Sequence, residues 1–257
     1  MPRYKAIIEY DGTDFFGFQI QKKQVTVQEV FEKSLNQICG TAIKVVGSGR
    51  TDARVHAAAQ VIHFDLPKVF EVMKLKEGLS HFLPEKIKVH HIEVVSDDFH
   101  ARYSAQKRTY IYNFFLGSDC PLYLKPFCEV IRYDLDIKRM GQAVKKIIGT
   151  HDFTAFCSTM DKSPSKVRRV YKANFKVKRV EKWPGLSEKT KGKLLHFEIE
   201  ANGFLHHMVR NIVGTLIEVG KHKIDLKTFQ NILTSRDRKK AGKTFSPQGL
   251  SLVKVKY

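Results

Sequence analysis

The chain has 257 residues, of which 42% are hydrophobic, so it can fold around one large core or two smaller ones rather than stay disordered. Lys and Arg outnumber Asp and Glu by 45 to 26, and the net charge of +19 indicates a polyanionic partner, either nucleic acid or an anionic membrane surface. No apolar run reaches about 18 residues, and neither a lipidation motif nor a signal-peptide core is found, so the sequence disfavours the membrane.

The first hundred residues predict the order strand, helix, strand, strand, helix, strand. Side chains alternate from Tyr4 to Tyr10, and the turn signal Asp11-Gly12 ends that strand. The apolar residues between Val27 and Cys39 fall on one helical stripe. We expect strands at 4–10, 42–46, 61–66 and 87–95, and helices at 27–39 and 68–82.

The second half repeats this pattern with longer elements. We expect strands at 108–115, 170–180, 195–202 and 252–257, and helices at 137–148, 204–219 and 226–233. The segment from Lys182 to Lys193 contains Pro and Gly and predicts an exposed loop. Two β-α-β-β-α-β-like halves, 1–103 and 104–257, therefore predict an α+β protein with mainly antiparallel strands and helices on one side.

The cysteines and histidines show no metal-binding pattern. No two of the four cysteines form a Cys-x-x-Cys pair, so we expect free thiols in a reducing compartment, the cytoplasm. The pairs His90-His91 and His206-His207 lack the spacing of a zinc-binding helix, so we expect no metal. The sequence also lacks a P-loop lysine and a Gly-x-Ser-x-Gly motif, which disfavours nucleotide-driven chemistry and serine hydrolysis.

The most informative stretch runs from Gly47 to Ala57, where Asp52 lies between Arg50 and Arg54 directly after a glycine-rich turn. The two cations favour the ionised carboxylate. An ionised carboxylate on a tight loop, with no second acid beside it, suits a nucleophile better than a proton donor. The alternative is that Asp52 only caps a helix or fixes a turn.

Two further motifs carry candidate functional side chains. Tyr110 and Tyr112 share one face of a strand and predict a stacking platform for an extruded base, or else two tyrosines in a packed sheet. Arg210 lies off the core stripe of its helix, and Gly214, one turn later, would let another backbone approach closely. Arg210 then either pairs with a carboxylate or is simply exposed to solvent.

Two basic clusters complete the candidates. Lys166 to Arg169, which includes Arg168, and Arg236 to Lys243 carry several cations each. Such clusters contact phosphates or form solvated faces, and the sequence alone leaves both alternatives open.

Taken together, these residues resemble the TruA family of tRNA pseudouridine synthases over nearly the whole chain. The order and spacing of the motifs make the likeness specific. The segments that carry it are Tyr10 to Gln19, Val27-Gln28, Gly49 to Asp52, Ser104-Ala105, Arg108 to Tyr112, Gly149 to Phe153, Arg168 to Val170, His206 to Gly214 and Gly249-Leu250.

The resemblance implies a fold and a set of roles. It implies two pseudo-symmetric, ferredoxin-like or RRM-like halves that share one extended sheet, with a basic cleft between them. It implies Asp52 as catalytic nucleophile with Arg50 beside it, Arg210 paired with Asp52, and Tyr110 stacked on the target uracil. Apart from the resemblance, Arg54 and Arg168 are further substrate-binding candidates, because each could contact a phosphate. It implies a homodimer that binds one tRNA at the anticodon stem-loop, with no cofactor and no metal.

Two departures from the family pattern stand out. Arg54 occupies a position where the family usually has glycine, so the loop either bends differently or gains a phosphate contact, because arginine adopts a positive φ less readily. Phe18 replaces the more usual tryptophan. Arg54 keeps open the alternative of a non-catalytic RNA-binding paralogue, whereas a DNA-binding regulator lacks any helix-turn-helix signal.

Overall fold

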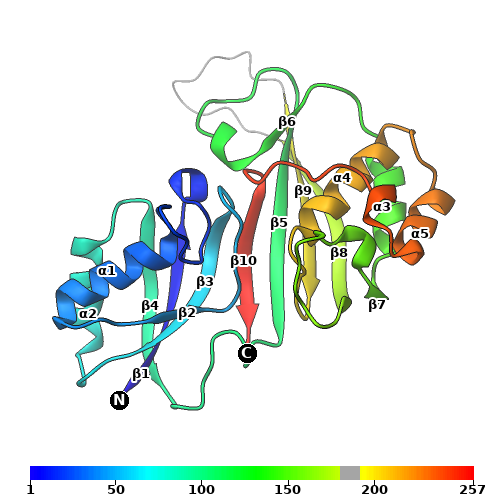
Figure 1. The fold of residues 1–257 in the computed structure, drawn as a ribbon. Coiled ribbons are helices and arrows are strands. Elements are labelled where there is room, and N and C mark those ends of the chain that lie inside the picture. The colour runs from blue at the N-terminus through cyan, green and yellow to red at the C-terminus, as the bar shows by residue number, and fades with distance from the viewer. Residues whose placement is uncertain (180–191) are drawn as a thin grey trace. The chain divides into compact units, whose positions relative to one another are not determined.

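The structure is a computed structural model that describes residues 1–179 and 192–257. The chain forms two compact units. Unit 1 comprises Met1–Arg108 and Ser251–Tyr257, and unit 2 comprises Thr109–Leu250 (Figure 1). Each unit combines helices with mainly antiparallel strands, so the described residues confirm the predicted α+β class.

Unit 1 has the predicted β-α-β-β-α-β order. Its strands run in the order β4-β1-β3-β10, with β2 paired to β3, and only the β10–β3 pairing among those described in this unit is parallel. This arrangement is ferredoxin-like. The elements are β1 (Arg3–Tyr10), α1 (Val27–Cys39), β2 (Val45–Gly47), β3 (His56–Asp65), α2 (Val72–Phe82), β4 (Ile87–Val95) and β10 (Leu250–Lys256), with the short 3-10 helix η1 (Gly12–Asp14) after β1.

The core of unit 1 forms where α1 packs on the sheet. Phe31 of α1 lies against Phe64 of β3, and Phe64 stacks on Tyr4 of β1 with ring centroids 5.9 Å apart. The Thr26 side chain caps α1 by accepting a hydrogen bond from the Glu29 backbone N–H, and Gly40 ends the helix with φ 68°. Both the residue that caps the start of α1 and the glycine that ends it can be read from the sequence. This explains why the predicted range 27–39 matches α1.

Unit 2 has the strand order β5-β9-β8-β7, and β6 pairs in parallel with β5. Helix α3 contacts α4, α5 and β8. The elements are β5 (Lys107–Leu116), β6 (Glu129–Ile131), α3 (Ile137–Lys145), β7 (Gly149–Asp152), β8 (Val167–Arg179), β9 (Lys193–Ala201), α4 (Met208–Gly220) and α5 (Leu226–Ser235), together with the 3-10 helices η2 (Lys125–Phe127), η3 (Thr154–Phe156) and η4 (Arg238–Lys240).

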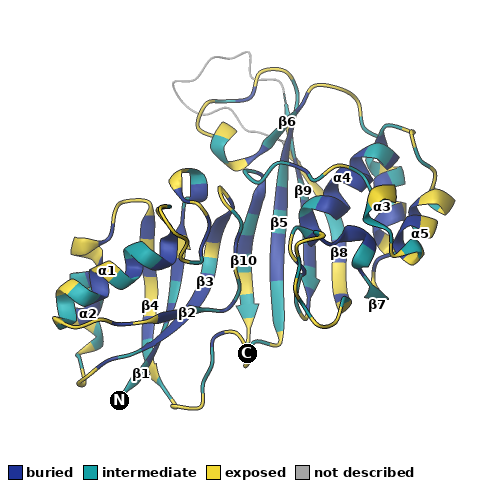
Figure 2. Cartoon of the chain, viewed as in Figure 1, coloured by how far each residue is buried: buried dark blue, intermediate teal, exposed yellow. Residues whose placement is uncertain are grey.

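Helix α4 is the most deeply buried helix of unit 2 (Figure 2). Its apolar residues, among them Met208, Ile212 and Leu216, are buried. Polar Asn211 and Thr215 are fully buried as well, and both make hydrogen bonds. A helix buried on almost every side is a rigid support for the side chains at its ends.

The structure corrects several predicted boundaries. Helix α4 begins at Met208 rather than at 204, because His207 has φ 62° and breaks the helical path. His206 is therefore not on the helix. Helix α2 begins at Val72 rather than at 68 and has no side-chain cap, and β3 begins at His56, five residues before the predicted start. Strands β6 and β7 were not predicted. Most of the expected loop at 182–193 lies outside the described residues.

Candidate functional site

The Asp52 loop joins β2 to β3 in unit 1. Asp52 is half-buried, whereas Arg50 and Arg54 beside it are exposed. The Val55 backbone N–H donates to the Asp52 carbonyl at 3.1 Å, which closes a tight turn around the acid. Arg54 adopts φ 64°, in the left-handed region that favours glycine. The loop therefore keeps the positive-φ turn that glycine would allow, even though an arginine occupies the position.

The segment after β1 is the scaffold of this loop. The Thr51 carbonyl accepts a hydrogen bond from the Phe18 backbone at 3.1 Å, and the Phe15 carbonyl accepts one from the Arg54 backbone at 3.1 Å. The Tyr10 hydroxyl and the Thr51 hydroxyl lie 2.8 Å apart in the core. Burial raises the pKa of Tyr10, so its phenol stays protonated as a hydrogen-bonding partner. These contacts fix the backbone on both sides of Asp52.

Two glycines of this segment allow the close approach. A Cβ on Gly12 would lie 2.1 Å from the Val55 carbonyl oxygen, and one on Gly17 would lie 2.6 Å from the Thr51 carbonyl oxygen. Gly17 also has φ 88°. The Tyr10-to-Gln19 signature carries part of the resemblance to the TruA family. Its physical role is to support the Asp52 loop.

Arg108 supports the first half of the loop. Its guanidinium donates to the Ser48 carbonyl from Nε at 3.1 Å and from Nη2 at 2.6 Å, and Nη2 also donates to the Arg102 carbonyl at 2.8 Å. Gln60 adds a hydrogen bond from its amide to the Gly49 carbonyl at 2.9 Å. The sequence marked Arg108 only as a cation beside two tyrosines, and nothing local pointed to the loop that it holds.

In unit 2, the two tyrosines of β5 have different environments. Tyr112 is fully buried, and its hydroxyl donates to the Ser246 carbonyl at 2.8 Å, so Tyr112 is a core residue and not part of a platform. Tyr110 is 7% exposed and meets Phe204 edge to face, with ring centroids 5.0 Å apart. Of the predicted pair, only Tyr110 remains a candidate for stacking on a base.

Arg210 lies in the first turn of α4. Its Nε donates to the Phe245 carbonyl at 2.7 Å, and the Phe245 backbone N–H donates back to the Arg210 carbonyl at 3.2 Å. Arg210 is half-buried, so it is not the fully solvated arginine that was the alternative interpretation. The predicted close approach at Gly214 is confirmed, since a Cβ there would lie 1.9 Å from the Lys243 carbonyl oxygen.

Arg168 lies at the start of β8. Its Nη1 donates to the carbonyls of Ser165, at 2.9 Å, and Val167, at 2.7 Å. Burial lowers the pKa of Arg168, which nevertheless remains a cation at neutral pH. Arg168 is thus held at the end of its loop by backbone carbonyls.

Asp161 anchors the loop that precedes β8. One carboxylate oxygen accepts from Lys166 Nζ at 2.6 Å and from the Ser163 backbone at 2.7 Å, and the other accepts from the His206 backbone at 2.7 Å. Burial alone would raise the pKa of Asp161, but these hydrogen bonds outweigh it and hold the pKa well below its usual range. No local sequence pattern pointed to Asp161, because its partners come from two separate segments.

The second basic cluster is not one uniform face. Arg236 pairs with Asp152 of β7 at 2.9 Å, and Arg238 turns inward to hydrogen-bond Asn211 of α4. Lys239, Lys240 and Lys243 are exposed. Part of this cluster therefore has a structural role, and only the lysines match the solvated or phosphate-contacting alternatives.

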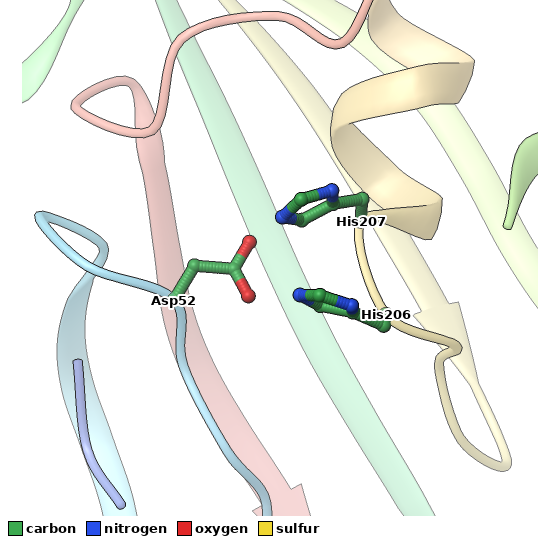
Figure 3. Close-up of side chains that lie close together, drawn as sticks. All are labelled: Asp52, His206 and His207. Atoms are coloured by element: carbon green, nitrogen blue, oxygen red, sulfur yellow. The ribbon is translucent and has the colours of Figure 1, made fainter. Parts of the chain in front are cut away.

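Figure 3 draws the side chains of Asp52, His206 and His207. Asp52 belongs to unit 1, and His206 and His207 lie just before α4 in unit 2. Within residues 1–179 and 192–257, every helix is too short or too polar to span a membrane.

A basic α+β protein with a carboxylate on a glycine-supported loop, a cation at the start of β8 and a tyrosine within β5 has the features of RNA-acting enzymes. A family model described as "tRNA pseudouridine synthase" matches residues 6–104 and 143–257. The chain belongs to this family, which confirms the TruA resemblance.

Curated relatives match the whole chain. "tRNA pseudouridine synthase A" of Brevibacillus brevis is 41% identical over 257 residues, covering 100% of this chain and 100% of that protein. The protein of the same name from Streptococcus mutans is 42% identical over 258 residues, covering 100% and 99%. The one from Geobacillus sp. is 41% identical over 256 residues, covering 99% and 98%.

One solved structure shows only a weak likeness to this chain. "Crystal structure of the archaeal box H/ACA sRNP Nop10-Cbf5 complex" aligns with a TM-score of 0.29 at 11% identity, covering 91% of this chain and 68% of that one. A likeness at this level carries no argument about fold or function.

Proposed function

We propose that this chain isomerises uridine to pseudouridine in the anticodon stem-loop of tRNA, with Asp52 as the nucleophile. Membership of the tRNA pseudouridine synthase family supports the reaction and the substrate class. The observation that carries the assignment of Asp52 is its position on a tight turn that Gly12, Gly17 and Arg108 hold in place. A fixed backbone keeps a reacting carboxylate in one orientation.

The reaction balances without an oxidant, a reductant or a second substrate. The bond between uracil N1 and ribose C1′ breaks, the base turns, and a bond forms between C5 and C1′. The C5 proton leaves and N1 gains a proton. In the proposal, the Asp52 carboxylate attacks C1′ or the base, and it assists removal of the C5 proton.

The other candidate residues have roles in binding and orientation. Arg210 pairs with Asp52 and orients it, and Arg50 lies beside the acid on the same loop. Tyr110 stacks on the uracil while the base turns. Arg54 and Arg168 bind phosphates of the tRNA.

The target base lies in structured RNA, so it must leave its stack before it reacts, at a cost of a few kcal/mol. Phosphate contacts on a protein with a net charge of +19 offset this cost. The proposal includes a homodimer that binds one tRNA and acts in the cytoplasm. Sedimentation of the protein alone and with tRNA tests the dimer, which would be contradicted by a monomer in both.

The decisive experiment measures tritium release from tRNA labelled at uracil C5. Asp52→Asn keeps the size of the side chain and removes its charge. We expect release to fall by at least about a thousandfold, since losing a nucleophile removes the covalent route, while tRNA affinity stays within about threefold. Asp98→Asn, an exposed acid of unit 1, is the matched control and should release tritium at the wild-type rate.

Two outcomes count against the proposal. Wild-type turnover by Asp52→Asn would show that Asp52 is not the nucleophile. Tight tRNA binding by the unmodified protein with no tritium release above background would favour the alternative, a non-catalytic RNA-binding paralogue. Arg54 in the loop is the feature that makes this alternative worth testing.

A further inference from the structure

Arg238 of η4 links the segment from Ala241 to Phe245 to helix α4. Arg238 Nη1 donates to the carbonyls of Gly242, at 2.9 Å, and Ala241, at 3.3 Å. Its Nη2 donates to Asn211 Oδ1 at 3.0 Å and to Thr244 Oγ1 at 3.1 Å. One planar guanidinium therefore fixes the backbone of this segment and links it to the N-terminal part of α4.

The partners of Arg238 are themselves fixed. Asn211 is fully buried, and its amide donates to the Phe156 carbonyl at 2.8 Å, so its Oδ1 has one orientation. Thr244 also donates to Asn211 Oδ1, at 2.7 Å. The amide nitrogen and Oδ1 of Asn211 both have hydrogen bonds, which leaves little freedom for the segment to move.

The backbone of the segment also fits closely against the helix. A Cβ on Gly214 would lie 1.9 Å from the Lys243 carbonyl oxygen, and one on Gly242 would lie 2.8 Å from the Gly214 backbone. The Gly242 N–H donates to the Thr215 hydroxyl at 2.9 Å. Gly242, the Lys243 backbone and Thr244 thus contact α4 directly.

This segment ends at Phe245, whose carbonyl accepts the hydrogen bond from Arg210 Nε at 2.7 Å. Phe245 is buried, and its N–H donates to the Arg210 carbonyl at 3.2 Å. The Phe245 carbonyl therefore holds one edge of the Arg210 guanidinium. Displacing the segment would move the carbonyl to which Arg210 donates.

We infer that Arg238 is a positioning residue that aligns the Arg210 guanidinium through the Phe245 carbonyl. The inference rests on the proposed function, in which Arg210 orients the catalytic carboxylate. It also separates Arg238 from the lysines around it. Arg238 acts on the rate of the chemical step, whereas the side chain of Lys239, its neighbour in η4, is exposed.

The test compares two neighbouring cations of η4. Arg238→Met keeps an apolar stem and removes the guanidinium. We expect kcat for tritium release to fall by about tenfold to a hundredfold, because a displacement of about 1 Å has this effect, while KM for tRNA stays within about twofold. Lys239→Met is the matched control and should keep the wild-type kcat. A raised KM with unchanged kcat for Arg238→Met, or an equal loss of kcat for Lys239→Met, overturns the inference.

A double variant tests whether Arg238 acts through Arg210. Adding Arg238→Met to Arg210→Lys should leave kcat within about twofold of the Arg210→Lys value, because the residue being aligned is already impaired. A full multiplicative loss overturns the inference. If circular dichroism shows that Arg238→Met fails to fold, Thr244→Val replaces it. This variant removes only the hydroxyl that accepts from Arg238 and donates to Asn211. It should lower kcat severalfold.

Failure of the inference can be told from failure of the proposed function. A wild-type kcat for Arg210→Lys contradicts the proposed role of Arg210, and the inference falls with it. If Arg210→Lys lowers kcat but Arg238→Met and Thr244→Val both keep the wild-type kcat, the inference is overturned and the proposed function stands.

Discussion

At the scale of single residues, Arg54 departs most clearly from what its backbone favours. It holds φ 64° on an exposed turn two residues after Asp52. A left-handed conformation costs a non-glycine residue about 1–2 kcal/mol, and glycine would avoid that cost. In the proposed function, a phosphate contact made by the guanidinium offsets this strain.

The variant Arg54→Gly separates strain from binding. We expect the free energy of unfolding to change by no more than about 1 kcal/mol, because relief of strain is opposed by the greater freedom of glycine in the unfolded chain. We expect weaker tRNA binding, with the slope of log affinity against log salt reduced by about one. Filter binding across a salt series measures both. Lys23→Gly, at φ 60° in the same unit, controls for the stability effect. An unchanged salt slope for Arg54→Gly would leave Arg54 without a phosphate contact.

Individual candidate residues could be predicted where neighbouring residues in the sequence form the motif. Asp52 between two arginines and the glycine-rich turn before it can be recognised from neighbouring letters alone. Tyr110 and Tyr112 could not be separated, because what distinguishes them is burial: the Tyr112 hydroxyl reaches Ser246, far along the chain. Asp161 and Arg108 were missed as supporting residues for the same reason, since each binds carbonyl or amide groups of distant segments.

At the scale of elements, α4 and the segment from Ala241 to Phe245 pack together as one unit of structure. Alternation and helical spacing predict most helices and strands because they follow from burial of one face. They fail where a single residue sets the geometry, as at His207, whose left-handed backbone delays α4. Gly214 was correctly predicted to admit a close backbone. Its partner, the Lys243 carbonyl, was not, because no short-range pattern links the two.

The variant Gly214→Ala tests this docking. We expect a loss of about 2–4 kcal/mol in the free energy of unfolding, because the added methyl group cannot fit beside the Lys243 carbonyl without moving the backbone. Gly141→Ala in α3 is the matched control. A Cβ there meets nothing within 4 Å, so we expect a gain of about 0.5–1 kcal/mol from helix propensity. Urea unfolding followed by circular dichroism gives both values. Equal stability of the two variants would mean that α4 and the segment are not in close contact.

At the scale of the whole molecule, composition alone predicted the class of partner. A net charge of +19 on a folded chain favours a polyanion, and the family to which the chain belongs acts on tRNA. Composition cannot place the charges. The structure uses Arg108 and Arg238 to hold backbone carbonyls, and it pairs Arg236 with Asp152, so these cations are engaged within the protein.

His63 in unit 1 and Asp161 in unit 2 should reduce the stability of the fold in different ranges of acid pH. In unit 1, burial, together with the charges of His100 and Arg3, lowers the pKa of His63 to about 4, and its Nδ1 accepts a hydrogen bond from the Ala101 N–H at 3.1 Å. His63 is therefore neutral in the folded state. Because the unfolded chain binds this proton near pH 6.5, stability is complete above that pH and falls as the pH drops from about 6.5 to about 4.

In unit 2, the lowered pKa of Asp161 has its effect at lower pH. The carboxylate stabilises the fold above the unfolded pKa of about 3.9, and this stability is lost only as the pH falls below that value. Thermal melts from pH 7 to 3 should thus show a first decrease in stability that His63→Gln flattens and a second, below pH 4, that Asp161→Asn flattens. His91→Gln, an exposed histidine of unit 1, is the control and should follow the wild-type curve. A first decrease that persists in His63→Gln would place its cause in another group, because removing the titrating ring must remove the linked protons.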